Sequence, residues 1–123
     1  MRAWTVAEVN QAIPRLRALI ERIRTLVREG RAATAEHTGR VQGNGQRPPA
    51  SEAAAELRAA LDELARDEIV LRDAETGLVD FPARSPSGRP YWLCWLPEEP
   101  EVGWWHWPDT GFAGRRPLSE PPD

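Results

Sequence analysis

The chain has 123 residues, 41% of them apolar and 28% charged, which are ordinary proportions for one globular domain. No stretch approaches the roughly 20 apolar residues that cross a bilayer, and the N-terminus lacks the apolar core of a signal peptide, so we expect a cytoplasmic protein without membrane segments. A net charge of -3 argues against a nucleic-acid partner, and a single cysteine excludes an internal disulfide. All 16 basic residues are arginine, which excludes lysine Schiff-base chemistry.

The first helix is predicted over about residues 5–29. Thr5 and Glu8 fit a capping box, in which each side chain bonds the backbone N–H of the other residue. Apolar residues recur along the helix at intervals of 4, 3, 4, 3 and 4, which is typical of a heptad seam. Pro14 lies inside this seam, removes one backbone hydrogen bond and predicts a bend.

A second helix is predicted over about residues 51–66, after a flexible, glycine-rich loop at about residues 30–49. Its apolar seam matches that of the first helix, so we expect an antiparallel helical hairpin. The charges agree, because residues 1–47 carry nine Arg against four acids, whereas residues 48–76 carry three Arg against eight acids. The wide apolar stripe of the first helix also suits a partner helix, and we expect a homodimer through it.

Residues 68–117 are predicted to form a β-rich block. Turn residues separate four short apolar or alternating segments, and the predicted strands are residues 68–72, 78–81, 91–96 and 102–107. Pro82 is expected to stop the second strand, and residues 118–123 are expected to be a disordered tail. The predicted fold class is therefore α+β, with an N-terminal antiparallel helical hairpin packed on a small C-terminal antiparallel β-meander, in a single domain of residues 1–117.

Aromatic residues are concentrated in this block, where eight of the nine lie within residues 81–112. Alternation along the last two predicted strands places aromatic side chains on both faces of the sheet. Trp104 and His106 share one face, and Trp105 and Trp107 take the other. Two interpretations stay open: all these side chains are core and dimer contacts, or one set lines a pocket or a recognition surface.

A pocket in this block is expected to combine aromatic side chains with arginine. The predicted ligand-binding residues are Trp95, Trp104, Trp105, His106, Arg115 and Arg116. The two arginines follow a loop that contains glycines, and a guanidinium in such a place suits a carboxylate or a phosphate. The alternative is that this loop is a C-terminal wrap whose arginines pair with nearby acids.

Three residues are candidates for chemistry, as catalytic groups or metal ligands. His106 is the best candidate for a base or a metal ligand, and Asp80, within an apolar strand, needs a partner, which His106, Arg115 or Arg116 could supply. An Asp80–His106 pair would orient a general base or a metal ligand, whereas an Asp80–Arg pair would be a structural clamp. Cys94 adds a third type of metal ligand without diagnostic spacing, and an inert buried thiol is the alternative. No catalytic role is assigned, and the sequence requires no cofactor.

Five segments of the chain share a pattern with known proteins: Thr5–Pro14, Gly77–Pro82, Leu93–Trp95, Trp105–His106 and Gly111–Arg115. Together they resemble a family of small bacterial proteins, domain of unknown function 2203, over nearly the whole chain apart from residues 30–49 and the tail. The positions that match the family motif are Asn10, Pro14, Asp80, Cys94, Trp105, His106 and Arg115. The resemblance implies a soluble bacterial protein with a helical hairpin and a C-terminal motif block, and it brings no established activity. One departure is Trp107, where relatives are expected to carry an acid.

Three hypotheses for the function follow. The leading one is a non-enzymatic binding or interaction module for a small anionic or aromatic ligand or for a protein partner. The second is a metal-dependent enzyme that uses His106, Asp80 and Cys94. The third is a purely structural assembly protein, for which we expect no pocket.

Overall fold

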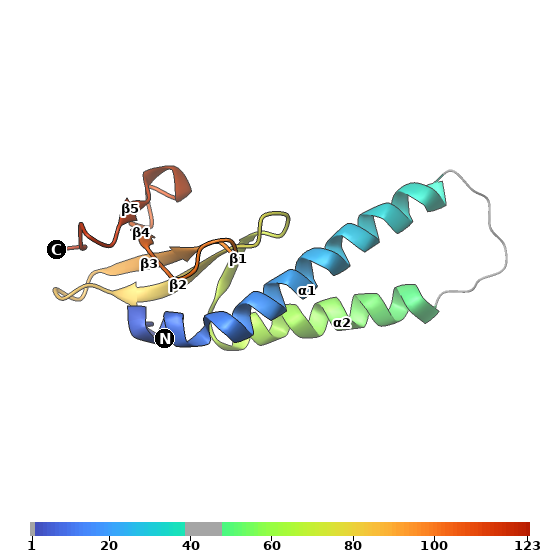
Figure 1. Ribbon diagram of the computed structural model, residues 1–123, viewed down its shortest axis with the longest axis horizontal. Coiled ribbons are helices and arrows are strands. Elements are labelled where there is room, and N and C mark those ends of the chain that lie inside the picture. The colour runs from blue at the N-terminus through green and yellow to red at the C-terminus, as the bar shows by residue number, and fades with distance from the viewer. Residues whose placement is uncertain (1, 39–47) are drawn as a thin grey trace.

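The N-terminal half of the protein is a helical hairpin. The computed structural model describes residues 2–38 and 48–123, in which α1 spans Val6–Thr38 and α2 spans Pro48–Arg66. Figure 1 shows the first turns of α1 beneath the sheet, while the distal parts of both helices extend beyond it. The predicted hairpin is therefore confirmed.

Both helices are longer than predicted. Residues 30–38 and 48–50 are helical, although we expected them to belong to a loop or to its border. Alanines with high helix propensity follow Gly30 and offset its cost of about 1 kcal/mol, and proline is tolerated in the first turn of a helix. The rest of the expected flexible loop, residues 39–47, lies outside the described residues.

The start of α1 has the predicted capping box. The backbone N–H of Glu8 donates to Thr5 Oγ1 at 3.1 Å, and the backbone N–H of Thr5 donates to Glu8 Oε1 at 3.0 Å. Pro14 lies inside the helix. The later turns of α1 rise away from the line of the first turns (Figure 1), in agreement with the bend that this proline predicts.

Opposite charges face each other along the hairpin. Arg15 contacts Glu63 at 3.1 Å and Asp67 at 3.3 Å, and Arg22 contacts Glu56 at 2.5 Å. Because these side chains are 32–49% exposed, water screens each pair and its contribution to stability is small. The ion pairs therefore favour the antiparallel arrangement, while burial of the apolar seams stabilises it.

The C-terminal half is one antiparallel sheet with the strand order β1-β2-β3-β4-β5. Its strands are β1 Val70–Asp73, β2 Leu78–Arg84, β3 Pro90–Trp95, β4 Trp104–His106 and β5 Arg116–Pro117. A 3₁₀ helix, Phe112–Gly114, precedes β5. The predicted meander and the α+β class are confirmed, with a shorter β4 than predicted. The fifth strand has only two residues, too few to show a period-2 pattern in the sequence.

Pro82 does not stop β2, contrary to prediction. The strand continues to Arg84, and Pro82 pairs with Trp92 of β3. The carbonyl oxygen of Pro82 accepts a hydrogen bond of 2.7 Å from the backbone N–H of Trp4. The backbone N and O of one residue point to the same side of a strand, so the nitrogen of Pro82, like its carbonyl oxygen, faces away from β3. The absence of an N–H at Pro82 therefore removes no hydrogen bond between β2 and β3.

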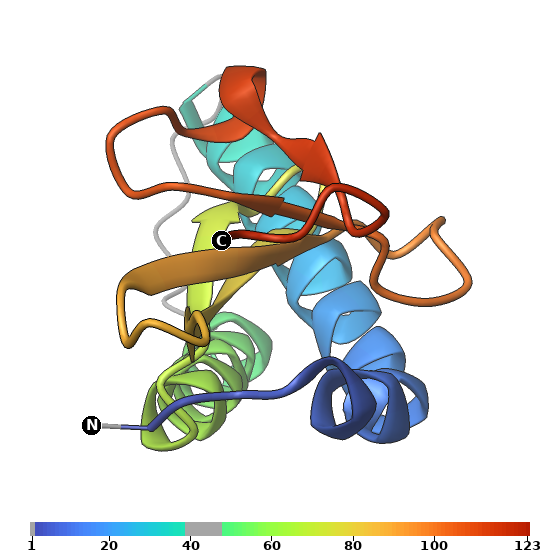
Figure 2. The same ribbon diagram turned by 90° about the vertical axis from the view of Figure 1, so that its left-hand side faces the viewer.

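The sheet has two faces with different coverings. The face that packs on α1 carries the buried residues Val79, Phe81, Leu93, Trp95 and Trp105, which join Val9, Ile13, Leu16, Ile20 and Ile23 in the core. The alternate positions, Asp80, Cys94, Trp104 and His106, lie on the outer face. Figure 2 shows the C-terminal segment (red) on the side of the sheet opposite the first turns of α1 (dark blue).

The C-terminal residues 118–123 are ordered against the sheet rather than a disordered tail. The backbone N–H of Leu118 donates to the carbonyl of Gly103 at 3.0 Å. The indole N–H of Trp105 donates to the carbonyl of Glu120 at 2.7 Å. A buried indole N–H needs an acceptor, and this segment supplies it.

Asn10 joins α1 to the segment that enters β4, because its Oδ1 accepts a hydrogen bond of 2.8 Å from the backbone N–H of buried Val102. Asn10→Ala should lower the free energy of unfolding by about 1–3 kcal/mol, since a buried N–H is left without a partner. Urea unfolding measures this. Asn10→Asp keeps an acceptor oxygen and should lose less, whereas equal losses in the two variants would contradict a role for this hydrogen bond.

Candidate functional site

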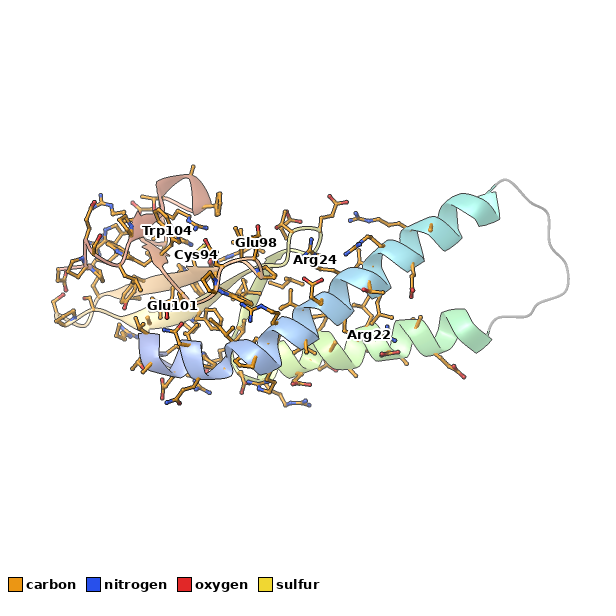
Figure 3. The ribbon with its side chains drawn as sticks, viewed as in Figure 1. Arg22, Arg24, Cys94, Glu98, Glu101 and Trp104 are labelled. Carbon is orange, nitrogen blue, oxygen red and sulfur yellow. The ribbon has the colours of Figure 1, made fainter. Side chains whose placement is uncertain are left out.

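Asp80, Cys94 and His106 come from three adjacent strands and meet on the outer face of the sheet. Asp80 and Trp104 each pair with Cys94 across neighbouring strands, and His106 lies two residues beyond Trp104. The ligand atoms of the three residues all lie within 4.8 Å of one another, and the residues are 1%, 0% and 4% exposed. Figure 3 shows Cys94 and Trp104 close together on the side of the sheet away from the helices. The structure therefore brings together all three residues predicted to be candidates for chemistry.

One short contact joins His106 to Asp80. Nε2 of His106 lies 2.8 Å from Oδ2 of Asp80, and Nδ1 lies 2.8 Å from the carbonyl oxygen of Trp107. A carbonyl oxygen only accepts, so Nδ1 carries a hydrogen and donates it. In a neutral imidazole, Nε2 is then an acceptor that faces a carboxylate oxygen, which is also an acceptor. A proton or another cation must therefore lie between these two atoms.

The arginine that contacts Asp80 is Arg72, and not Arg115 or Arg116 as expected. Its Nε donates to Oδ2 at 2.9 Å, and its guanidinium lies 4.8 Å from the ring centroid of Trp92. The other carboxylate oxygen, Oδ1, is buried and has no hydrogen-bond partner among the described residues. Because leaving a buried acceptor unpaired costs about 1–3 kcal/mol, a cation or a donor beside Oδ1 would be stabilising.

The thiol of Cys94 is buried beside the Asp80 carboxylate. Burial, and then the negative charge of Asp80, raise the pKa of this thiol to about 12, while the positive charge of Arg115 acts in the opposite direction. Nη1 of Arg115 lies 3.8 Å from Sγ and donates to it. The thiol therefore stays protonated at neutral pH and is not a nucleophile by itself.

A pocket of about 250 Å³ opens beside the cluster, and its walls are Arg72, Leu78, Asp80, His106, Pro108, Gly111 and Phe112. Phe112 is 49% exposed, and the side chain of Arg72 is 41% exposed. Within the part of the chain that the structure describes, Arg72 donates through Nε alone. Its two terminal nitrogens are therefore available to a molecule in the pocket.

The six predicted ligand-binding residues do not gather in one place. Trp95 and Trp105 lie in the core, 0% and 1% exposed, because their positions on β3 and β4 face α1. Trp104 and His106 share the outer face, as the alternation predicts, but of these two only His106 lines the pocket. Trp95 and Trp105 therefore share no surface with Trp104, and ligand binding by these residues stays a prediction.

The two C-terminal arginines also lie outside the pocket walls. Arg115 forms an ion pair with Glu99, and its guanidinium lies 4.5 Å from the ring centroid of Trp104. The guanidinium of Arg116 lies 5.7 Å from the ring centroid of Trp105. The pairing of Arg115 with an acid agrees with the alternative of a C-terminal wrap, and a role for either arginine in ligand binding stays a prediction.

Two residues of this region were missed in the sequence. Arg72 contacts Asp80 from eight residues away, and the signal for it was its position in the strand that pairs with β2. Glu99 lies in the turn after β3 and pairs with Arg115. No local pattern marks that second pair, since it depends on how the C-terminal segment folds back over the sheet.

The fold and the site together define an α+β protein in which a helical hairpin carries an antiparallel sheet with a buried Asp-Cys-His cluster beside a pocket. The chain belongs to a family of uncharacterized conserved proteins, DUF2203, whose model matches residues 2–118. This match confirms the family resemblance seen in the sequence. No curated protein and no solved structure matches the chain. The described helices contain no apolar stretch of membrane-spanning length.

Cys94 should react with iodoacetamide at pH 8 about 10³-fold more slowly in the folded protein than in the urea-unfolded chain. The thiolate is the reacting form, and a pKa of about 12 leaves far less of it than the ordinary thiol pKa of about 8.5 in the unfolded chain. Burial of the sulfur, which is 0% exposed, also keeps the reagent away, so the pKa effect alone sets the smallest expected difference. Mass spectrometry measures the rates, and equal rates in the two states would contradict the raised pKa.

Arg115→Ala should lower the free energy of unfolding by about 1–3 kcal/mol, because it leaves the largely buried carboxylate of Glu99 without its ion-pair partner. Arg116→Ala is the matched control. Arg116 is exposed, so its removal should change stability by no more than about 0.5 kcal/mol. Urea denaturation of both variants measures the difference, and equal stability of the two would refute a structural role for the Arg115–Glu99 pair.

Proposed function

We propose that this protein is a small-molecule-binding module whose pocket takes a small carboxylate that carries an apolar group. The observation that supports this best is the placement of Arg72. Its Nε is fixed on Asp80 at the pocket wall, while its terminal nitrogens have no partners among the described residues. An arginine held in this way presents its remaining donors in one plane, which suits the two oxygens of a carboxylate.

The charge of the pocket walls favours an anion. A proton shared between His106 and Asp80 leaves that pair without net charge, so Arg72 supplies an excess positive charge. The second guanidinium near the cluster, that of Arg115, is already neutralised by Glu99. A carboxylate that enters the pocket therefore interacts with an arginine whose charge is only partly compensated.

The remaining walls suit an apolar group of limited size. Leu78, Pro108 and Phe112 present carbon atoms to the pocket. A volume of about 250 Å³ lies near the lower end of ligand pockets, which begin at about 300 Å³. A ligand with one ring or a short aliphatic chain is therefore the size that we propose, and half-exposed Phe112 offers its ring for stacking.

The other hypotheses carry less support as complete functions. The metal-dependent enzyme is favoured by the meeting of His106, Asp80 and Cys94, which is taken further in the next subsection. The structural assembly protein lacks such support, since a pocket is present.

A homodimer through helix 1 stays a proposal. The apolar seam of α1 is already buried within one chain, so a partner helix would have to pack on another part of α1. We also propose a cytoplasmic location, where a free thiol such as Cys94 stays reduced.

Benzoate is a suitable first probe, with neutral benzamide of nearly the same shape as its control. In isothermal titration calorimetry with a chelator present, benzoate should bind the wild-type protein more tightly than benzamide does. Arg72→Gln should weaken benzoate binding roughly tenfold or more, because a charge-assisted hydrogen bond contributes about 1.5–3 kcal/mol. Arg116→Gln, away from the pocket walls, should bind benzoate as the wild type does.

Phe112→Ala provides a second test, because this side chain is 49% exposed and its loss should leave the fold intact. We expect weaker benzoate binding in this variant with at most a small loss of thermal stability, since the ring also lies 4.8 Å from the guanidinium of Arg115. Equal affinity for benzoate and benzamide in the wild type would overturn the proposal, and so would full benzoate affinity in a folded Arg72→Gln variant.

A further inference from the structure

We propose that Asp80, Cys94 and His106 form a binding site for one Zn²⁺ ion. The three residues offer a carboxylate oxygen, a thiolate sulfur and an imidazole nitrogen, which are the three ligand types that zinc uses in proteins. This inference goes beyond the binding of an organic ligand and does not depend on it. It rests on the geometry of the cluster, on its unpaired atom and on the residues around it.

The spacing of the donor atoms already approaches that of a metal site. In a tetrahedral zinc site with bonds of about 2.0–2.3 Å, neighbouring ligand atoms lie roughly 3.5 Å apart. Here the contact between His106 and Asp80 is 2.8 Å, and every ligand atom of the cluster, the sulfur included, lies within 4.8 Å of the others. Small side-chain adjustments of about 1 Å therefore suffice to place all three atoms around one ion.

The electrostatics of the cluster also require a cation. Nε2 of His106 and Oδ2 of Asp80 are two acceptors in contact, which calls for positive charge between them. The second oxygen of Asp80, Oδ1, is buried in a side chain only 2% exposed and has no hydrogen-bond partner among the described residues. A proton between His106 and Asp80 satisfies the first need alone, whereas a metal ion within the cluster satisfies both.

The surroundings of the three residues match the outer shell of known metal sites. Ligating histidines usually donate their other ring N–H to a backbone carbonyl or a carboxylate, and Nδ1 of His106 donates to the carbonyl of Trp107. Ligating carboxylates are themselves hydrogen-bonded, and Arg72 donates to Asp80 at 2.9 Å. These contacts hold the imidazole ring of His106 and the carboxylate of Asp80 so that Nε2 and the carboxylate oxygens point toward the proposed position of the ion.

The charge balance is compatible with a divalent ion despite two nearby arginines. Zinc binding displaces the thiol proton of Cys94 and the proton shared by His106 and Asp80, so one thiolate and one carboxylate neutralise the ion. Arg115, the arginine nearest to the sulfur, is paired with Glu99. Asp80 and His106 also line the pocket, so water or a small ligand in the pocket has access to a fourth coordination position.

Cobalt substitution tests the proposal directly. Untagged protein is freed of metal with a chelator and then titrated with Co²⁺, which replaces zinc and reports its ligands in the absorption spectrum. We expect a 1:1 endpoint, a thiolate-to-cobalt charge-transfer band in the near ultraviolet and intense tetrahedral visible bands, all abolished by Zn²⁺. Zinc at 100-fold excess over its Kd should also raise the Tm by about 5–10 °C.

Three variants distinguish this site from adventitious binding. Cys94→Ser should lose the charge-transfer band, and Asp80→Asn should weaken Co²⁺ binding at least tenfold. His37→Ala removes the only other histidine of the chain and should behave as the wild type does. If Asp80→Asn fails to fold, Cys94→Ser together with the zinc-induced Tm shift decides alone. The proposal is overturned if the wild type binds no Co²⁺, or if the spectrum and the stoichiometry are the same in Cys94→Ser.

Discussion

The contact between His106 and Asp80 is the constraint on which the outer face of the sheet depends. Two acceptor atoms 2.8 Å apart in a buried place are stable only when a cation lies between them. Residues 107–117 lie over the same face, where Pro108, Gly111 and Phe112 form walls of the pocket, and the chain then returns to the sheet as β5. The helices cover one face of the sheet, and this segment covers the other.

Stacked arginines are the second theme of the structure. The guanidinium groups of Arg2, Arg89 and Arg115 lie 3.5, 3.7 and 4.5 Å from tryptophan ring centroids. A planar guanidinium can stack on an indole and still donate hydrogen bonds along its edge, which an ammonium group cannot do equally well. Arg115 uses both properties at once, since it contacts Trp104, Glu99 and the sulfur of Cys94.

Periodic features of this chain were predictable from the sequence, and features that depend on chain reversal were not. The capping box at Thr5, the seam of the first helix and the alternation of Trp104 and Trp105 follow from local geometry, and each is confirmed. The seam predicted for the second helix is confirmed only in part, because Leu64 is buried whereas Leu61 is 38% exposed. The extension of β2 past Pro82 could not be predicted, because it depends on which side of the strand lacks a neighbour. The meeting of Asp80, Cys94 and His106 was a hypothesis without diagnostic spacing, since antiparallel register rather than sequence separation brings these residues together.

The cluster of Asp80, Cys94 and His106 forms only when β2, β3 and β4 pair in the native register. His106 and Asp80 are 26 residues apart in the chain, so the cluster does not exist before β2, β3 and β4 have paired. A slip of one residue between β2 and β3 would turn Asp80 toward the apolar face that packs on α1. Cys94 would then pair with a different residue of β2. Burying the carboxylate of Asp80 on that apolar face would cost free energy. The cluster therefore destabilises sheets with a shifted register relative to the native one.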